Sequence, residues 1–165
     1  MRPKGSAFLY VDPKHQKEIH PTNISHNYLT TFKSEFDWVG THDPTAWLSV
    51  SAALAFINEI GVYEMRSYGH NLALDARKML TNSFGSKVLA PADMIGMLAT
   101  IQLPGNPNDT DKHTATLHDR LRDEFHCELP VIVMDGHTYV RISAQVYNQM
   151  SEYEQLAAAI KKIYG

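Results

Sequence analysis

Cysteine is nearly absent from this chain of 165 residues, which contains only one. A single cysteine excludes a disulfide framework and a cysteine-based zinc cluster, and it is typical of a protein from a reducing compartment. Long hydrophobic runs are also missing. The longest uncharged apolar stretch, residues 45–57, has thirteen residues, too few to cross about 30 Å of hydrocarbon. The first residues carry no long apolar segment of the kind found in signal peptides. These absences predict a soluble, cytoplasmic protein that does not enter a membrane.

An excess of positive charge is missing as well. Fifteen lysines and arginines stand against eighteen acidic residues, so the formal net charge is −3. Because a general nucleic-acid binder presents a basic face, nucleic acid is not an expected partner. The 44% hydrophobic and 20% charged residues are ordinary for a globular chain and argue against disorder. The length suggests one domain, or one domain and a small part of another.

The first third of the chain is predicted to contain one short strand and one unusually apolar helix. Residues 6–11 are apolar and partly β-branched, which is typical of a strand, and residues 12–37 predict a loop with one helical turn. A helix is expected from Asp43, as its N-cap, to the glycine at position 61. This helix has almost no polar face, which indicates that it is buried on several sides by protein from outside this chain.

The rest of the chain predicts an α+β fold with antiparallel strands backed by helices. An amphipathic helix over residues 63–84 is followed by a β-α-β-β-α succession over residues 95–103, 112–126, 129–134, 137–144 and 152–164. Asp135 and Gly136 join the last two strands and predict a two-residue hairpin turn of type I′. Ser151, with Glu154 three residues later, has the pattern of a capping box.

The hairpin places Arg141 on a defined face. Across the predicted turn Val131 pairs with Val140 and Pro130 with Arg141. Val140 and Ile142 then form the core face, and Arg141 points away from it. Two interpretations remain open: an exposed strand arginine, or a planar fork that binds a carboxylate with two hydrogen bonds.

Three other features have an ordinary interpretation beside a functional one. Gly40 and Thr41 form a turn that can offer N–H and O–H groups to an anion such as phosphate, or simply leads into the helix. Cys127, next to His126, is either an activated thiolate or a small buried side chain. The nine histidines show no spacing typical of a metal site, so no metal is expected.

Three stretches together resemble the C-terminal part of class V aminotransferase-type enzymes. These enzymes are pyridoxal-phosphate-dependent proteins of fold type I, and the resemblance is to the isopenicillin N epimerase-like branch. The stretches are residues 2–11, residues 35–48 and residues 139–148. The resemblance implies that residues 1–42 are a remnant of the large, cofactor-binding domain. Residues 43–61 would be a connecting buried helix, and residues 62–165 the small C-terminal domain.

The resemblance also implies roles for matching residues. Gly40 and Thr41 would hydrogen-bond the phosphate of the cofactor held by a partner subunit in a homodimer, and Arg141 would bind the α-carboxylate of an amino-acid substrate. The lysine that forms the Schiff base is expected upstream of Met1, since Lys4 matches a lysine of a neighbouring turn. Cys127 does not match the catalytic cysteine loop of related desulfurases.

We therefore expect a C-terminal fragment of a pyridoxal-phosphate (PLP) enzyme of the epimerase, lyase or aminotransferase type. Without its catalytic lysine the fragment is expected to be inactive alone and not to retain the cofactor. The alternative is a natural short chain that serves as a non-catalytic binding or dimerisation module derived from that family.

Overall fold

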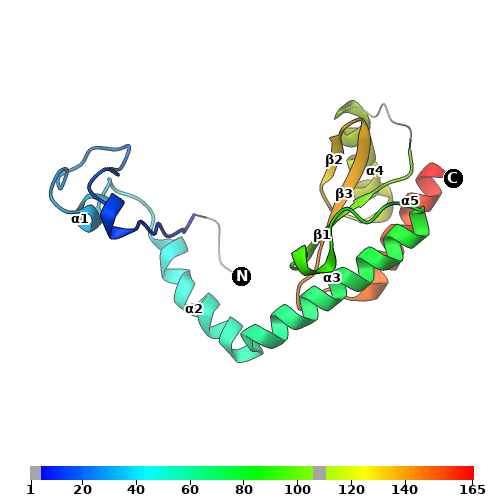
Figure 1. Ribbon diagram of the computed structural model, residues 1–165, viewed down its shortest axis with the longest axis horizontal. Coiled ribbons are helices and arrows are strands. Elements are labelled where there is room, and N and C mark those ends of the chain that lie inside the picture. The colour runs from blue at the N-terminus through cyan, green and yellow to red at the C-terminus, as the bar shows by residue number, and fades with distance from the viewer. Residues whose placement is uncertain (1–4, 106–110) are drawn as a thin grey trace. The chain divides into compact units, whose positions relative to one another are not determined.

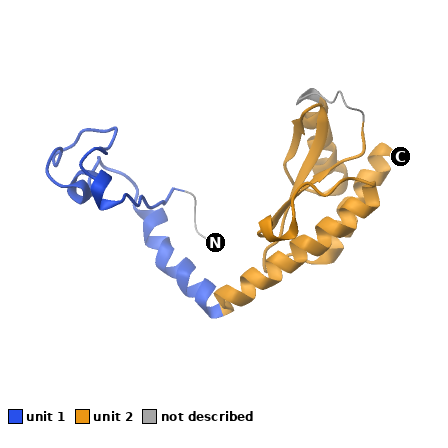
Figure 2. Ribbon diagram, in the orientation of Figure 1, with its two compact units in different colours: residues 1–59 blue, residues 60–165 orange. Residues whose placement is uncertain are grey.

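The computed structural model describes residues 5–105 and 111–165 (Figure 1). The prediction for Lys4 falls outside these residues. The chain divides into two compact units, residues 1–59 and residues 60–165 (Figure 2), and each unit is described by itself. No single described helix is both long and apolar enough to cross a membrane, although α2 (Thr45–Ile60) and α3 (Val62–Phe84) counted together reach that length and composition.

The N-terminal unit contains a 3₁₀ turn, η1 (Pro13–His15), and two helices, α1 (Phe32–Asp37) and α2 (Thr45–Ile60). The predicted strand over residues 6–11 is wrong, because this segment pairs with no strand in the part of the chain that the structure describes. The predicted loop over residues 12–37 is wrong at its end, where α1 forms. Thr31 is the N-cap of α1, and its hydroxyl accepts a hydrogen bond from the Ser34 N–H at 3.3 Å.

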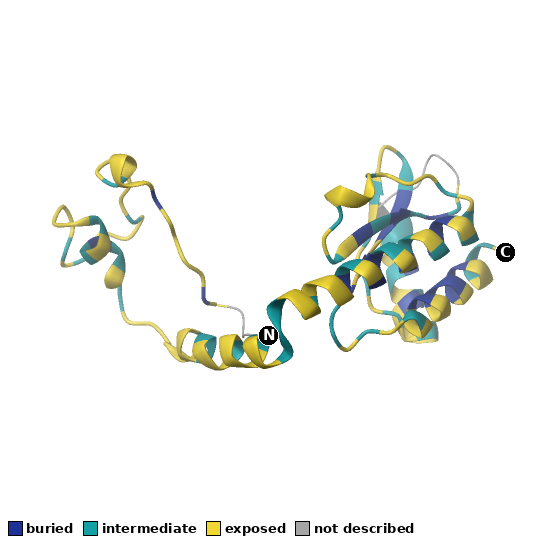
Figure 3. Cartoon of the chain, turned by 60° about the horizontal axis from the view of Figure 1, so that its bottom comes forward, coloured by how far each residue is buried: buried dark blue, intermediate teal, exposed yellow. Residues whose placement is uncertain are grey.

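Helix α2 is the most unusual element of the N-terminal unit. Its start agrees with the prediction, since a carboxylate oxygen of Asp43 accepts a hydrogen bond from the Thr45 N–H at 2.9 Å. It ends before Gly61, whose φ is +95°. In this chain α2 has no buried residue, and Figure 3 shows the helix mostly exposed. Its predicted burial depends on protein outside this chain and stays a prediction.

The C-terminal unit has the predicted α+β fold. Its elements are α3 (Val62–Phe84), the 3₁₀ turn η2 (Ala92–Met94), β1 (Leu98–Gln102), α4 (Asp111–Phe125), β2 (Val131–Met134), β3 (His137–Ser143) and α5 (Met150–Tyr164). The strands form one antiparallel sheet in the order β1-β3-β2. Helix α3 packs against β1 and α5, and α4 packs against β2 and α5. The predicted β-α-β-β-α succession is therefore confirmed.

The core of this unit lies between the sheet and the three helices. Its most deeply buried side chains are Leu80, Ile101, Leu121, Val140 and Ile160. Val131 pairs with Val140, and the Arg141 N–H donates to the Pro130 carbonyl at 3.2 Å, so the predicted hairpin register is confirmed. Val140 and Ile142 lie on the core face, as expected.

The hairpin turn has the predicted type. Asp135 and Gly136 have φ values of +49° and +74°, and a type I′ turn needs positive φ at both central positions. We expect Gly136→Val to lower the free energy of unfolding by about 1 kcal/mol or more, because a β-branched side chain is strained in the left-handed region. Asp135→Asn is the control and should change stability little. Urea unfolding measures the free energy of unfolding of both variants. If Gly136→Val is as stable as Asp135→Asn, the type I′ turn is contradicted.

The start of α5 differs from the prediction. The capping box is formed by Gln149 and Glu152 instead of Ser151 and Glu154. A Glu152 carboxylate oxygen accepts the Gln149 N–H at 2.7 Å, while the Gln149 side chain accepts the N–H of Glu152. The glutamate that reaches back lies two residues earlier than predicted, and the helix begins correspondingly earlier.

Candidate functional site

Arg141 lies near the middle of β3, on the sheet face opposite the core. Strand pairing places Thr100 of β1 directly opposite it. The Arg141 side chain is exposed, and within residues 5–105 and 111–165 its guanidinium has no ion pair or hydrogen bond. Most other arginines of this unit are engaged: Arg120 and Arg122 pair with carboxylates, and Arg77 donates to a carbonyl. Arg141 is thus a cation free to bind an anionic group.

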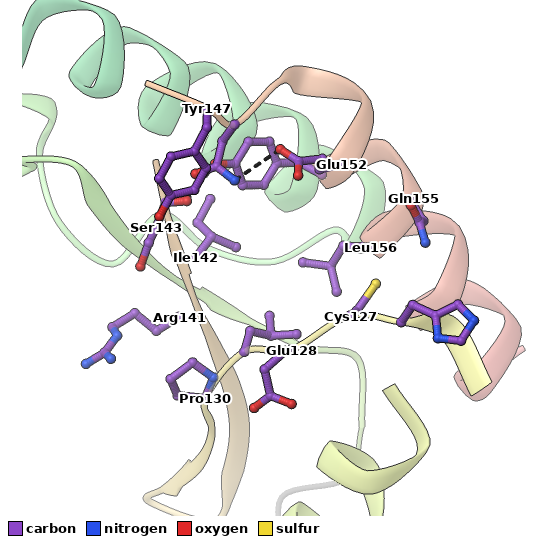
Figure 4. Close-up of a pocket in the computed structure, with 14 residues that line it drawn as sticks. Cys127, Glu128, Pro130, Arg141, Ile142, Ser143, Tyr147, Glu152, Gln155 and Leu156 are labelled. Carbon is purple, nitrogen blue, oxygen red and sulfur yellow. Dashed lines mark hydrogen bonds between the residues drawn. The ribbon is translucent and has the colours of Figure 1, made fainter. Parts of the chain in front are cut away.

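A cavity of roughly 330 Å³ borders Arg141 (Figure 4). Its wall is formed by the connection between α4 and β2, the end of β3, the loop after β3 and the first turns of α5. In Figure 4 the guanidinium of Arg141 points away from Cys127 and Leu156. The charge therefore stands at the rim of the cavity, where a ligand can reach it.

Cys127 lies in the same wall but does not have the environment of a reactive thiol. It is half-buried, and its thiol contacts the Phe125 carbonyl at 3.5 Å. Burial raises the pKa of the Cys127 thiol above its usual value. A raised pKa keeps the sulfur protonated, whereas a nucleophilic cysteine needs a lowered one. This geometry favours the interpretation of Cys127 as a small buried side chain.

The loop that follows Arg141 is held by side chains that sequence reasoning did not single out. The Tyr153 hydroxyl donates to the Ser143 carbonyl at 2.6 Å, and the Tyr68 hydroxyl donates to the Asn148 carbonyl at 2.6 Å. The side-chain oxygen of Asn148 accepts the Gln145 N–H at 3.0 Å. Of these side chains, only that of Asn148 lies in a stretch with a family resemblance, residues 139–148. These bonds fix the end of β3 relative to α3 and α5.

Tyr153 makes the stability of this region depend on pH. Burial is the main cause that raises its pKa from 10.0 to about 12. Because the folded state holds this proton more tightly than the unfolded state, the stabilisation is complete below pH 10 and is lost as pH rises to about 12. We expect Tyr153→Phe to reduce that loss and to destabilise the protein by about 1 kcal/mol at neutral pH.

The test measures the melting temperature at a series of pH values from neutral up to about 12, which is the raised pKa of Tyr153. Tyr63→Phe is the matched control, since Tyr63 is 82% exposed on α3. A Tyr153→Phe variant with the pH dependence of the original chain would show that Tyr153 is not the titrating group.

Gly40 and Thr41 belong to the N-terminal unit, in the loop before α2. Gly40 has a φ of +137°, a conformation that strongly favours glycine, although no atom lies within 4 Å of the position of a side-chain carbon. Thr41 is exposed, and the Gly40 carbonyl lies 3.0 Å from the His42 Nδ1. The role of Gly40 and Thr41 in binding a phosphate stays a prediction. Within the described residues, no group of three or more metal-ligating side chains is present.

Comparison with known proteins shows which family has this architecture. Residues 1–156 match the profile of the family described as aminotransferase class-V. The chain is 29% identical to a putative L-cysteine desulfhydrase 1 of Oryza sativa subsp. japonica, over 98% of this chain and 38% of that protein. It is 32% identical to an isopenicillin N epimerase of Amycolatopsis lactamdurans, over 99% of this chain and 44% of that protein.

A solved structure shares the fold. A crystal structure of Oryza sativa TDC with PLP and tryptamine matches 84% of this chain and 30% of that chain, with a TM-score of 0.55 and 15% identity. The curated relatives are longer than this chain, which spans about two fifths of the length of each of these two enzymes. The family match over nearly all of its length shows that this chain belongs to the class V aminotransferase family of PLP-dependent enzymes.

Proposed function

We propose that this chain is the C-terminal part of a PLP-dependent enzyme that transforms amino acids, and that Arg141 binds the α-carboxylate of the substrate. The observation that carries the proposal is the free, exposed guanidinium of Arg141 at the rim of a cavity. A planar guanidinium can donate two parallel hydrogen bonds to a carboxylate. The relatives support the substrate class, since their names describe enzymes that act on L-cysteine and isopenicillin N.

The residues present fit part of a PLP site. The Gly40–Thr41 turn can donate N–H and O–H groups to a phosphate, and its backbone conformation leaves the approach open. When bound, PLP supplies an electron sink for the bond that breaks at the α-carbon of the substrate. The contribution of this chain is orientation, because Arg141 would fix the carboxylate and thereby the direction of that bond.

The lysine that would hold the cofactor has no good candidate in the described part of the chain. All seven lysines whose side chains the structure describes are exposed: Lys14, Lys17, Lys33, Lys78, Lys87, Lys161 and Lys162. A useful Schiff-base lysine needs a lowered pKa, which comes from burial or from neighbouring positive charge. This supports the proposal that the catalytic lysine lies on protein outside this sequence and that the chain alone is not competent.

Helix α2 supports the proposal of a missing partner. Together with the extended segment at residues 6–8 it forms an apolar hollow of roughly 720 Å³ within the N-terminal unit, lined by residues such as Phe8, Trp47 and Leu54. Phe8 is 94% exposed. Apolar surface of this kind is typical of a face that other protein covers. In our proposal the remainder of the large domain and a second subunit cover it, as in a homodimer.

The exposure of α2 also allows a second function. A short chain with an apolar docking face, and with no suitable lysine among the described residues, would serve as a non-catalytic binding or dimerisation module. Sequencing the DNA upstream of the Met1 codon separates the two. An in-frame extension with a cofactor lysine supports the enzyme part, and an in-frame stop codon supports the module.

A further inference from the structure

Glu35 is the only charged residue that is buried in the part of the chain that the structure describes. Its side chain is 5% exposed. Acidic side chains are rarely buried unless their charge is paired, because taking a carboxylate out of water is costly. Neither the hydrophobic core of the C-terminal unit nor the cavity beside Arg141 includes Glu35. A charge buried at this cost needs a reason of its own.

The carboxylate of Glu35 joins three segments of the N-terminal unit. One oxygen accepts a hydrogen bond from the Leu29 N–H at 3.1 Å, and the other lies 2.7 Å from the His20 Nδ1. Leu29 has a φ of +61°, a left-handed conformation that is uncommon for residues other than glycine. The His20 ring packs edge-on against the Tyr28 ring, with centroids 5.6 Å apart. Both oxygens therefore have partners within the unit, and the loop before α1 is tied to the helix.

Helix α1 depends on these contacts for its position. It has six residues, and an isolated helix of fewer than about 12–15 residues is marginal in water, so α1 needs contacts with the rest of the unit. Glu35 is its only buried residue. The contacts of this one side chain are therefore the main ones that fix the direction of α1 against the preceding loop.

Helix α1 leads directly into the Gly40–Thr41 turn. The helix ends at Asp37, and Trp38 continues as extended backbone. After the turn, the His42 ring lies beside the Trp38 ring with centroids 6.3 Å apart, and the His42 Nδ1 lies 3.0 Å from the Gly40 carbonyl oxygen. The turn is thus closed by local contacts, and its position follows from the end of α1.

We propose that Glu35 is a positioning residue for the phosphate of the cofactor. Through α1 it holds the Gly40–Thr41 turn where the N–H and O–H groups of the turn meet the phosphate, and Glu35 itself does not touch the phosphate. This inference rests on the proposed function, in which that turn binds the phosphate. Because a displacement of about 1 Å can cost about 100-fold in rate, the loss of the Glu35 contacts should weaken the phosphate contact measurably.

The experiment measures the affinity of the complete apoenzyme that carries this chain for PLP and for pyridoxal, which lacks the phosphate. The ratio of the two dissociation constants reports on the phosphate contact, whereas a general weakening of the fold lowers both affinities. We expect Glu35→Ala to reduce the preference for PLP by about tenfold or more, while the affinity for pyridoxal changes little. Glu35→Asp keeps the charge but shortens its reach by one carbon, so its loss should be intermediate.

Two further variants serve as control and as a test of the turn itself. Glu18→Ala is the matched control, because the Glu18 side chain is 78% exposed in the same unit, and it should keep the full preference for PLP. Thr41→Val removes the hydroxyl of the turn and should reduce the preference by about tenfold. If Glu35 acts through the turn, the double variant Glu35→Ala, Thr41→Val should lose less than the product of the two single losses.

Three outcomes would overturn the inference. In the first, both Glu35 variants keep the preference for PLP while Thr41→Val loses it, so the proposed function stands without the role of Glu35. In the second, Glu35→Ala lowers both affinities equally, or its loss multiplies fully with that of Thr41→Val, so Glu35 does not act through the turn. In the third, Thr41→Val keeps the preference, and the phosphate role of the turn fails together with the inference. If Glu35→Ala does not fold, Glu35→Asp decides by the same comparisons.

Discussion

Replacing Arg141 by alanine in a complete enzyme that carries this chain is expected to raise the KM for the amino-acid substrate by about 100-fold. A 100-fold effect corresponds to about 2.7 kcal/mol, which lies within the net contribution of about 1.5–3 kcal/mol for a hydrogen bond to a charged group. Cofactor loading, followed by the absorbance of the cofactor, should change little, because Arg141 lies in the C-terminal unit and is proposed to contact the substrate alone.

Two further variants show whether the effect is specific to the guanidinium of Arg141. Arg141→Lys should recover little, because a single ammonium does not reproduce the planar fork of a guanidinium. Arg120→Ala is the control: Arg120 is an arginine of the same unit, on α4, whose guanidinium is already paired with Glu124 at 2.9 Å. Steady-state kinetics in which Arg141→Ala behaves like Arg120→Ala would remove Arg141 from the substrate site.

The isolated chain is expected to self-associate through α2. Leu48 and Phe56 on this helix are 73% and 48% exposed, and burying one such side chain is worth about 1.5–3 kcal/mol. We expect the double variant Leu48→Glu, Phe56→Glu to convert large assemblies of the chain to monomers in size-exclusion chromatography with light scattering. An effect of several kcal/mol on association corresponds to more than a hundredfold in the equilibrium constant.

A matched control comes from the other unit. Met94 is 75% exposed in η2, so Met94→Glu removes a comparable apolar side chain without touching α2. It should leave the association state unchanged. A wild-type chain that is monomeric at high concentration would contradict the role of α2 as an interface. So would a Met94→Glu variant that dissociates as well as the α2 variant.

The C-terminal unit was predictable because its turns and helix ends are determined by residues close together in the sequence, and because its hydrophobic core is complete within this unit. The Asp135-Gly136 turn sets the hairpin register, and that register alone places Val140 in the core and Arg141 outside it. Helix α3 ends as its sequence predicts, at Gly85, whose φ is +63°. At α5 only the first residue of the helix differs from the prediction, because either of two glutamates near the start of the helix could have formed the capping box.

The N-terminal unit was less predictable, because its apolar segments lack the partners that would define them. Residues 6–11 have the composition of a strand, yet no neighbouring strand among the described residues pairs with them. Helix α1 was missed because six residues are too few for a helical pattern of apolar side chains to show in the sequence. It depends on a longer-range contact: the buried Glu35 carboxylate accepts the Leu29 N–H at 3.1 Å and lies 2.7 Å from the His20 Nδ1.

The candidate site was predictable in part. The orientation of Arg141 followed from the hairpin, but the cavity beside it did not, because it is built from four segments that meet only in the fold. The bonds of Tyr68 and Tyr153 to the loop after β3 also join residues distant in sequence. The roles of Arg141, Gly40 and Thr41, the homodimer and the cytoplasmic location stay predictions.

The most direct test of the central proposal, that this chain depends on a lysine outside it, is chemical. The chain is incubated with PLP, reduced with borohydride and digested, and the labelled lysines are identified by mass spectrometry. We expect weak labelling scattered over exposed lysines such as Lys14 and Lys161, and no turnover of any amino acid. One stoichiometric adduct on a single lysine, accompanied by turnover of an amino acid, would show that the chain is an enzyme in its own right.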